Sequence, residues 1–291
     1  MGTVGAVAGT AVGPMTIVAI EQYEATPLVR NQLARSFLPA TARTLASFGR
    51  FGWARRLFFT ATERKLPGLW ASILCRKRHL DDDIVTAIES GCTSVVVLGA
   101  GLDDRVCRIP ALATTAVFEV DLPCNITTKY RRLHALCGDV PANLTLVPIN
   151  LATEDLSRVL ARHGYDAGQS TYFLCEGVTQ YLSAEDIRRT LDALASAPAG
   201  SRLGFTYILD EFVTGEALHG GHRAHREYVA TGKLWRSGMN PERVRSLLVE
   251  RGWRIREDVG AQEHTERYLT PNYRGLRATA IERTVTAEKT S

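Results

Sequence analysis

Two glycines separated by one residue follow an apolar run in the first half of the chain. Gly99 and Gly101 flank Ala100, directly after residues 94–98. Glycine here lets the backbone turn tightly and lets a ligand approach where a Cβ would otherwise stand. The triplet alone is weak evidence, because close turns in other α/β proteins also use glycine. It predicts a ligand site at the end of a strand.

Acidic residues after the glycines bear on the identity of this ligand. Asp104 stands where the dinucleotide fingerprint G-x-G-x-x-G requires its third glycine, and Asp103 precedes it. A pyrophosphate would meet two like charges there, whereas a cofactor without phosphates and with a cationic sulfonium would be attracted. The pattern therefore favours S-adenosylmethionine over NAD.

Two further acids end the next apolar run. Glu119 and Asp121 lie about 20 residues beyond the glycines, the spacing of a carboxylate that binds the hydroxyls of a ribose. Their side chains point to the same side of a strand, so only one is expected to contact the sugar. The alternative is that both acids merely end a strand in solvent.

The elements that must position these residues alternate along the chain. Continuous apolar runs are typical of parallel strands buried on both faces, and helical stretches separate them here. The runs are residues 94–98, 116–120, 144–148, 171–175 and 203–208, with late strands at 253–259 and 278–287. This alternation predicts an α/β fold with a Rossmann-like, doubly wound, mostly parallel sheet and right-handed crossovers.

The segment before the first strand has helical periodicity instead. Apolar residues recur at three- and four-residue intervals. The predicted helices are residues 16–24, 27–37, 41–48, 53–62 and 69–89. We therefore predict a flexible tail over residues 1–14, a helical cap over 15–90 and a Rossmann-like domain over 91–291. That domain carries a lid insertion over 209–240, after the fifth strand.

Composition excludes several classes of protein. The chain of 291 residues is 45% hydrophobic and 23% charged, as in ordinary globular proteins, and its net charge of +4 does not suggest nucleic-acid binding. No stretch approaches the roughly 20 apolar residues that would span a bilayer. The six cysteines form no C-x-x-C pair, which favours free thiols. We expect a soluble, cytoplasmic protein whose oligomeric state the sequence leaves open.

The charge is nevertheless uneven. Residues 30–78 contain eleven arginines and lysines but a single acid, Glu63. Aromatic residues are interleaved with these cations: Phe48, Phe51, Trp53, Phe58 and Phe59. Such a segment could dock on a membrane or a partner protein. The interpretation we favour is that the aromatic rings pack the helical cap onto the sheet.

Three motifs resemble the leucine carboxyl methyltransferase family. They are VVVLGAGLDDR at residues 95–105, FEVDLP at 118–123 and EGVTQYL at 176–182. The resemblance runs from about residue 15 to the end. The family includes the eukaryotic enzyme that methylates the C-terminal leucine of a protein phosphatase, and actinobacterial enzymes, some of which methylate polyketide carboxyl groups. The resemblance implies an S-adenosylmethionine-dependent O-methyltransferase.

The resemblance also implies roles for individual residues. The amino-acid part of the cofactor would lie against Gly99, Ala100 and Gly101, with its ammonium on Glu176 and its carboxylate on Arg76. The ribose would bind Asp121 beside Leu122. Asn150 and Leu151 match a pair whose first residue is usually an aspartate that binds adenine. The family often has a basic residue near Gln22, which this chain lacks; Gln22 stays a candidate substrate contact.

The methyl acceptor is a separate question. An ionised carboxylate is already a nucleophile at neutral pH, whereas a hydroxyl requires a general base. The candidate substrate contacts are Gln22, Gln180, Tyr181, Tyr207 and Arg236, and the candidate catalytic residues are Tyr181, Tyr207 and His222. His219, His222 and His225 follow at three-residue steps that drift around a helix, so no metal site is predicted.

We expect methylation of a carboxyl group on a small molecule or a peptide C-terminus. One alternative is methylation of a hydroxyl or phenol, with a lid histidine as the base. The others are an NAD(P)-dependent oxidoreductase and a non-catalytic binding protein that share this fold.

Overall fold

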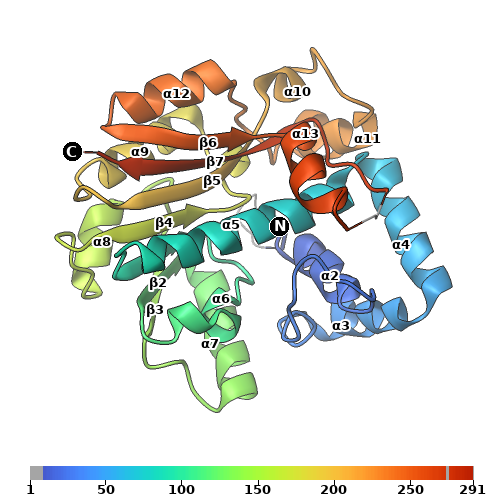
Figure 1. Cartoon of the computed structure of the whole chain (residues 1–291), viewed down its shortest axis with the longest axis horizontal. Coiled ribbons are helices and arrows are strands. Elements are labelled where there is room, and N and C mark those ends of the chain that lie inside the picture. Colours follow the sequence, from blue (N-terminus) through green and yellow to red (C-terminus); the bar gives the residue numbers. More distant parts are fainter. Residues whose placement is uncertain (1–8, 273–274, 291) are drawn as a thin grey trace.

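The computed structural model describes residues 9–272 and 275–290, and a seven-stranded sheet lies at its centre (Figure 1). The strand order is β3-β2-β1-β4-β5-β7-β6. The five strands β1 to β5 are parallel, and β7 lies antiparallel between β5 and β6. The predicted Rossmann-like fold is confirmed. Successive connections change direction between β1 and β4, which is where such sheets bind ligands.

The strands fall close to the predicted ranges. They are β1 (Ser94–Leu98), β2 (Ala116–Asp121), β3 (Leu144–Pro148), β4 (Thr171–Cys175), β5 (Arg202–Ile208), β6 (Trp253–Val259) and β7 (Glu282–Lys289). The predicted start of the last strand, at residue 278, is wrong. Glu282 pairs with Ile208, the last residue of β5, so β7 begins where its partner strand ends.

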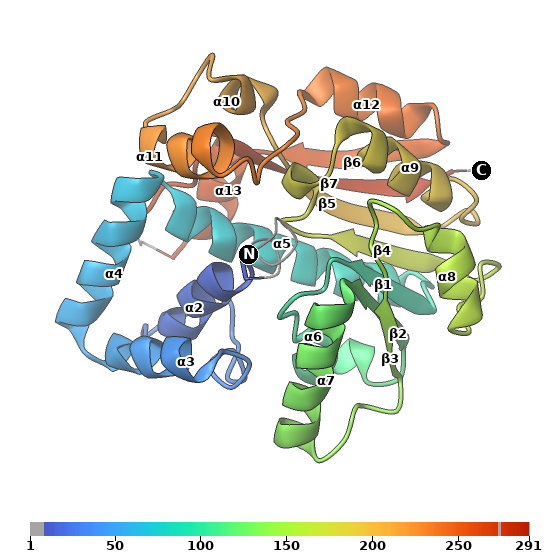
Figure 2. The same ribbon diagram turned by 180° about the vertical axis from the view of Figure 1, so that it is seen from behind.

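Helices cover both faces of the sheet. One apolar cluster packs α5 (Leu69–Glu89), α6 (Arg105–Arg108) and α7 (Pro123–Cys137) on the first face. A second packs α8 (Leu156–Arg162), α9 (Ala184–Leu194) and α12 (Pro241–Val249) on the other (Figure 2). Side chains alternate across a strand, so Val95 and Val97 of β1 enter the first cluster and Val96 and Leu98 the second.

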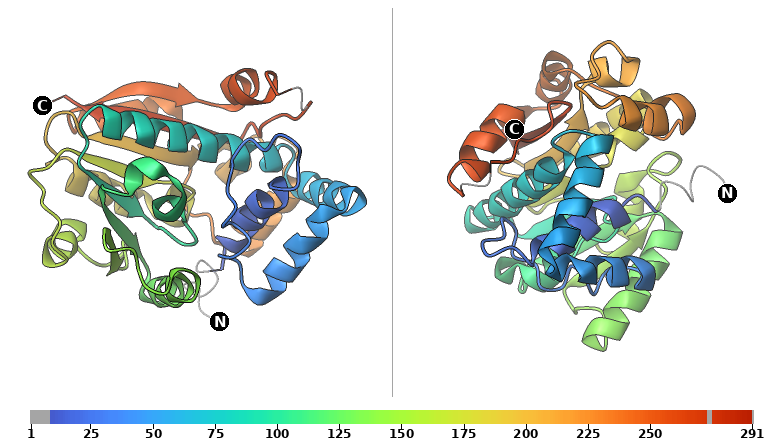
Figure 3. Two further views of the ribbon diagram at one scale, coloured as in Figure 1. Left: turned by 60° about the horizontal axis from the view of Figure 1, so that its bottom comes forward. Right: turned by 90° about the vertical axis from the view of Figure 1, so that its right-hand side faces the viewer.

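The remaining N-terminal helices are α2 (Val12–Glu21), α3 (Ala40–Ser47) and α4 (Gly52–Lys65), joined by the 3₁₀ turn η1 (Phe48–Arg50). Figure 3 shows them at one end of the molecule, beside the sheet. Met15 and Ile17 of α2 share the first apolar cluster with β1, so this segment and the sheet have a common core. The division into domains stays a prediction.

Two predictions for this segment are wrong. The expected tail extends to residue 14, but α2 begins at Val12; residues 1–8 lie outside the described part. Residues 27–37 form turns instead of a helix. The side chain of Gln22 organises them, because its amide donates to the Val29 carbonyl at 2.9 Å and its oxygen accepts from the Asn31 N–H at 2.7 Å.

The aromatic residues of the basic segment divide into two groups. Phe58 and Phe59 pack against the core, as expected. Phe48, Phe51 and Trp53 are exposed, so the expectation that they pack the cap onto the sheet is wrong for these three. Ala46 is buried in the first apolar cluster, and Phe58 packs against that cluster, whereas the three exposed rings lie outside it.

The insertion over residues 209–240 covers the end of β5. It contains α10 (Asp210–Thr214), α11 (His222–His225) and the π-helical turn η4 (Arg226–Thr231). Lys65, the last residue of α4, contacts this predicted lid through an ion pair with Glu227 at 2.7 Å and a cation–π contact with Tyr228. The short elements elsewhere are η2 (Pro110–Leu112), η3 (Thr179–Tyr181), α13 (Ala261–His264) and η5 (Thr265–Leu269).

Two further expectations concern the whole molecule. All six cysteines are free thiols. Among the helices of the described residues, none combines the length and apolar character needed to cross a bilayer.

Candidate active site

The glycine turn after β1 is closely packed from two sides. Gly99 and Gly101 have φ angles of +70° and +47°, which side chains rarely adopt. A Cβ on Gly99 would lie 2.4 Å from a methyl carbon of Val178, which follows β4. A Cβ on Gly101 would lie 3.0 Å from the Cβ of Ala11. The Gly99 N–H donates to the Val120 carbonyl at 2.7 Å, which ties the turn to β2.

Asp121 ends β2 directly beside this turn. Its Oδ2 accepts from the Gly101 N–H at 2.5 Å, and its Oδ1 accepts from the Leu122 N–H at 2.6 Å and the Asn125 amide at 2.8 Å. A carboxylate offers about four acceptor positions, so one on Oδ2 is still available to a hydroxyl.

Glu119, the other acid of this strand, has a different environment. It is fully buried and forms an ion pair with Lys129. Burial raises the pKa of Glu119 to about 7, against the opposing effect of Lys129. Of the two acids that the sequence could not separate, Asp121 lies at the turn and Glu119 in the interior.

A network of ion pairs surrounds the ends of β1 and β4. Glu176, directly after β4, accepts from Arg76 Nε at 3.1 Å and from Arg105 Nη2 at 2.6 Å. Arg76 also pairs with Glu282 of β7. The network continues through Arg105 to Asp81 and Asp103, and through Arg108 to Asp81 and Asp104.

The network keeps Glu176 ionised. Burial alone would raise the pKa of this carboxyl, but Arg105, Lys77 and Arg76 outweigh burial and lower the pKa to about 2. The charges of Arg105, Lys77 and Lys129 likewise hold the pKa of Asp103 far below its ordinary value despite burial. An acid held this firmly in its charged form can receive a cation but is a poor base.

Lys77 is the site residue that sequence reasoning missed. It follows Arg76 on α5 and is only 7% exposed, yet its ammonium donates no hydrogen bond to any residue that the structure describes. A signal was available in the sequence. Lys77 lies on the same helical stripe as Ile73, Leu80 and Ile84, all of which are buried, so its spacing indicates a buried position.

The charges of this network leave room for a cation. Ion pairs join three arginines, Arg76, Arg105 and Arg108, to five carboxylates, Asp81, Asp103, Asp104, Glu176 and Glu282. With Lys77 as a fourth positive charge, one negative charge is in excess. S-adenosylmethionine carries a sulfonium, an ammonium and a carboxylate, which sum to one positive charge. The residues present therefore fit this cofactor.

The Asn150–Leu151 pair follows β3. Asn150 Oδ1 accepts from the Ala152 N–H at 3.0 Å, so the oxygen expected to bind adenine already closes a turn. The Asn150 side-chain nitrogen donates to no described residue. Leu151 is buried, and its carbonyl accepts from Arg189 at 2.9 Å. The pair offers an amide donor and an apolar side chain.

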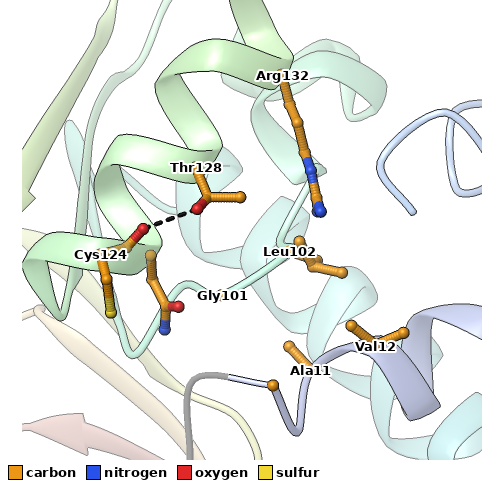
Figure 4. Close-up of a pocket in the computed structure, with 9 residues that line it drawn as sticks. Ala11, Val12, Gly101, Leu102, Cys124, Thr128 and Arg132 are labelled. Atoms are coloured by element: carbon orange, nitrogen blue, oxygen red, sulfur yellow. Dashed lines mark hydrogen bonds between the residues drawn. The ribbon is translucent and has the colours of Figure 1, made fainter. Parts of the chain in front are cut away.

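A cavity of about 250 Å³ adjoins the glycine turn (Figure 4). Gly101 and Leu102 line it, as does Asn125, which donates to Asp121. Ala11 and Val12 close it from the N-terminal segment. The cavity therefore lies beside Asp121 and beneath the start of α2.

The candidate substrate contacts do not all meet. Tyr207 is buried in the second apolar cluster, and its hydroxyl donates to Asp258 of β6 at 3.0 Å. Arg236 donates its backbone N–H to the Gln180 carbonyl at 2.6 Å, while its half-exposed guanidinium points toward Asp186 of α9, 4.0 Å away. Gln22 is occupied with the turns after α2.

The candidate residues beneath the predicted lid have different surroundings. The Tyr181 ring packs against the apolar cluster formed by Phe212 and Trp235. Three buried polar atoms in this region lack partners among the described residues: Gln180 Oε1, His225 Nε2 and Trp235 Nε1. His222, the candidate base, is exposed at the start of α11, and His219 pairs with Glu211 at 2.7 Å.

Comparisons with known proteins agree with this geometry. The family model described as leucine carboxyl methyltransferase matches residues 11–195. A Frankia alni protein named as an S-adenosyl-L-methionine-dependent methyltransferase is 32% identical over 252 residues, which are 84% of this chain and 81% of the relative. A second Frankia alni protein with such a name is 31% identical over 265 residues, 87% of each chain.

The fold has solved counterparts as well. A Thermobifida fusca protein described as a methyltransferase has a TM-score of 0.58 and 17% identity, over 83% of this chain and 90% of the other. This likeness concerns the fold, whereas the sequence matches decide between the methyltransferase and the oxidoreductase considered from the sequence. The chain belongs to the leucine carboxyl methyltransferase family of S-adenosyl-L-methionine-dependent methyltransferases.

Proposed function

We propose that this methyltransferase transfers a methyl group to a carboxylate oxygen, using a cofactor site built around β1, β2 and β4. Gly99, Ala100 and Gly101 hold the cofactor's amino-acid part, and Glu176 receives its ammonium. Asp121, beside Leu122, binds the ribose through the open position on Oδ2. Asn150 and Leu151 contact the adenine. When bound, S-adenosylmethionine supplies a methyl group on a positively charged sulfur, which a nucleophile displaces.

Arg76 acts here mainly through Glu176. Its guanidinium is held between Glu176 and Glu282 and is buried, so both partners fix its orientation. The carboxylate of the cofactor then has a cation in Lys77, whose ammonium donates to none of the residues in 9–272 and 275–290. We assign the carboxylate to Lys77 together with Arg76, which extends the role implied by the family resemblance.

The observation that carries the choice of acceptor is that two acids near the ends of β1 and β4, Glu176 and Asp103, are committed to cations. Glu176 is paired with two arginines, and the pKa values of Glu176 and Asp103 are lowered. These groups do not withdraw a proton from a hydroxyl at neutral pH. A carboxylic acid with a pKa near 4 arrives already ionised and requires only orientation and exclusion of water.

The region beneath the lid is suited to orient such an acceptor. An unpartnered buried polar atom costs roughly 1–3 kcal/mol, which a ligand can recover. Trp235 Nε1 is a donor, and His225 Nε2 is a donor in one of its tautomers. The aromatic rings of Tyr181, Phe212 and Trp235 exclude water around them. The acceptor class that fits is an organic carboxylate with an apolar body.

The test is to incubate the purified enzyme with S-adenosylmethionine and matched pairs of acceptors, each a carboxylic acid and the corresponding phenol or alcohol. Formation of S-adenosylhomocysteine measures turnover. Methyl esters release methanol in alkali, whereas methyl ethers do not. Turnover confined to acids, with an alkali-labile product, supports the proposal. An alkali-stable product would instead establish a hydroxyl acceptor and contradict it.

A further inference from the structure

Exposed large apolar side chains are concentrated in one part of this molecule. Eight such residues are exposed in the described structure, and five of them lie between residues 45 and 57. They are Leu45 (49% exposed), Phe48 (46%), Phe51 (40%), Trp53 (66%) and Leu57 (61%). The other three, Tyr130, Leu136 and Val249, are on α7 and α12. We call the five residues, with the arginines around them, the α3–α4 surface.

The geometry of α4 explains this exposure. The helix has 14 residues, but Ala54 is its one buried side chain. Trp53 and Leu57 are one turn apart on its outer face, and Arg64 continues that face. The Phe51 ring stacks on Trp53 with centroids 6.3 Å apart. Figure 1 shows α4 at the outer edge of the molecule, away from the sheet.

The charge of the surface has one sign. Arg43, Arg50, Arg56 and Arg64 are exposed, and the Arg50 guanidinium lies 4.6 Å from the centre of the Phe51 ring. The single acid of the segment, Glu63, turns inward and accepts from the Gly68 N–H at 2.7 Å. The outer face therefore combines arginine, aromatic rings and leucine without an exposed acid of its own.

This combination of side chains indicates what kind of partner fits the surface. A second copy of the chain is disfavoured, because a two-fold interface would set these arginines against themselves. Aromatic and leucine side chains on a helix with basic flanks are typical of elements that lie in the headgroup region of a membrane. Arginine binds phosphate groups in a bidentate manner.

We propose that the α3–α4 surface docks reversibly on anionic phospholipid bilayers, with Trp53 and Leu57 entering the headgroup region and the arginines binding lipid phosphates. The inference is independent of the methyl acceptor. It places the lid next to the lipid, since Lys65 at the end of α4 holds Glu227 and Tyr228.

The experiment is co-sedimentation of the full chain with phosphatidylcholine vesicles, with and without phosphatidylglycerol. We expect binding to the anionic vesicles that weakens as salt is added. Trp53 gives a direct signal, because the other three tryptophans, Trp70, Trp235 and Trp253, are buried. Its emission should shift to shorter wavelength on binding, and the shift should vanish in Trp53→Phe.

Two double variants separate the contributions, and a third is the matched control. Trp53→Ser with Leu57→Ser, and Arg50→Glu with Arg56→Glu, should each weaken binding by roughly tenfold or more. Arg245→Glu with Val249→Ser removes an exposed arginine and an exposed apolar residue one turn apart on α12 and should bind as the unmodified chain does. Because all these side chains are exposed, thermal unfolding should be unchanged.

Three results would overturn the proposal. Equal loss of binding in the α12 control would show that net charge alone acts. Self-association without lipid, abolished by the Trp53 and Leu57 substitutions, would assign the surface to a second copy. Failure to bind either kind of vesicle would exclude a bilayer and leave an acidic protein as the occupant.

Discussion

Replacement of Lys77 by methionine tests the electrostatic description of the site most directly. Methionine keeps the length and apolar stem of the side chain but removes its charge. Lys77 is 7% exposed and has no hydrogen bond to a described residue, so the substitution breaks no such bond in the ligand-free protein, although it removes a charge that helps to lower the pKa values of Glu176 and Asp103. If Lys77 binds the cofactor's carboxylate, the variant loses one charge-assisted hydrogen bond when the cofactor binds.

The expected loss of affinity follows from this one hydrogen bond. A hydrogen bond to a charged group contributes about 1.5–3 kcal/mol, which corresponds to a loss of affinity of roughly 10- to 150-fold. Isothermal titration calorimetry with S-adenosylhomocysteine measures it. 5′-Methylthioadenosine, which lacks the amino-acid part, should bind the variant and the unmodified protein equally. The control is Arg78→Met, since Arg78 is half-exposed and pairs with Asp82 on the same helix.

Unchanged affinity for S-adenosylhomocysteine in Lys77→Met would refute the assignment. A raised KM for the methyl acceptor in that same variant would then place Lys77 on the acceptor's carboxylate. Equal losses for both nucleosides would indicate that the substitution disturbs the glycine turn instead.

The remaining predictions concern Asp121, Gly99 and His264. Asp121→Ala removes the acceptor for three hydrogen bonds and for the ribose, so calorimetry should show severe loss of S-adenosylhomocysteine binding. The control Arg236→Ala changes a surface residue and should bind normally. Equal affinities of the two variants would contradict the assignment of the site. Gly99→Ala places a Cβ against Val178 at positive φ and should lower the free energy of unfolding by about 1–2 kcal/mol or more in urea denaturation. Adding Val178→Ala should restore part of this stability. Absence of recovery would show that backbone strain alone is responsible. Burial, with His79 and Arg267, lowers the pKa of His264 from 6.5 to about 3, so the unfolded chain binds a proton that the folded one does not. Stability from this group is therefore complete above pH 6.5 and declines as the pH falls, by about 2 kcal/mol at about pH 5, and His264→Gln should flatten that decline; an unaltered slope would assign the acid sensitivity to other groups.

Much of the fold could be predicted from the sequence because buried parallel strands carry a strong local signal. The ranges of β1, β3 and β4 agree with their apolar runs. Residues 27–37 have helical spacing yet form turns, because Gln22 and Asn31 supply hydrogen bonds that compete with a helix. Asn31 also donates to Asp104 at 2.6 Å, a contact 73 residues away that no local pattern reveals.

The positions of Gly99, Asp121 and Glu176 at strand ends could be predicted from the sequence, and their roles stay predictions. The surroundings of a candidate residue could not be predicted where they depend on a side chain from a distant part of the chain. Tyr207 lies near the end of β5, as a substrate contact would, but its hydroxyl donates to Asp258 of β6. In the sequence, Lys77 is one of three adjacent cations. Its buried position becomes evident only when the buried stripe of α5 is followed along the helix.

The packing of Ala11 on the glycine turn has a consequence for handling the protein. A purification tag at the amino terminus lengthens the segment that closes the cavity beside Gly101 and should therefore perturb cofactor affinity. The carboxyl end is a better attachment point. Because β7 is antiparallel, Lys289 lies near Arg202 at the amino-terminal edge of the parallel strands, opposite the glycine turn. Tags, fluorophores and surface immobilisation placed there lie at the edge of the sheet opposite the glycine turn.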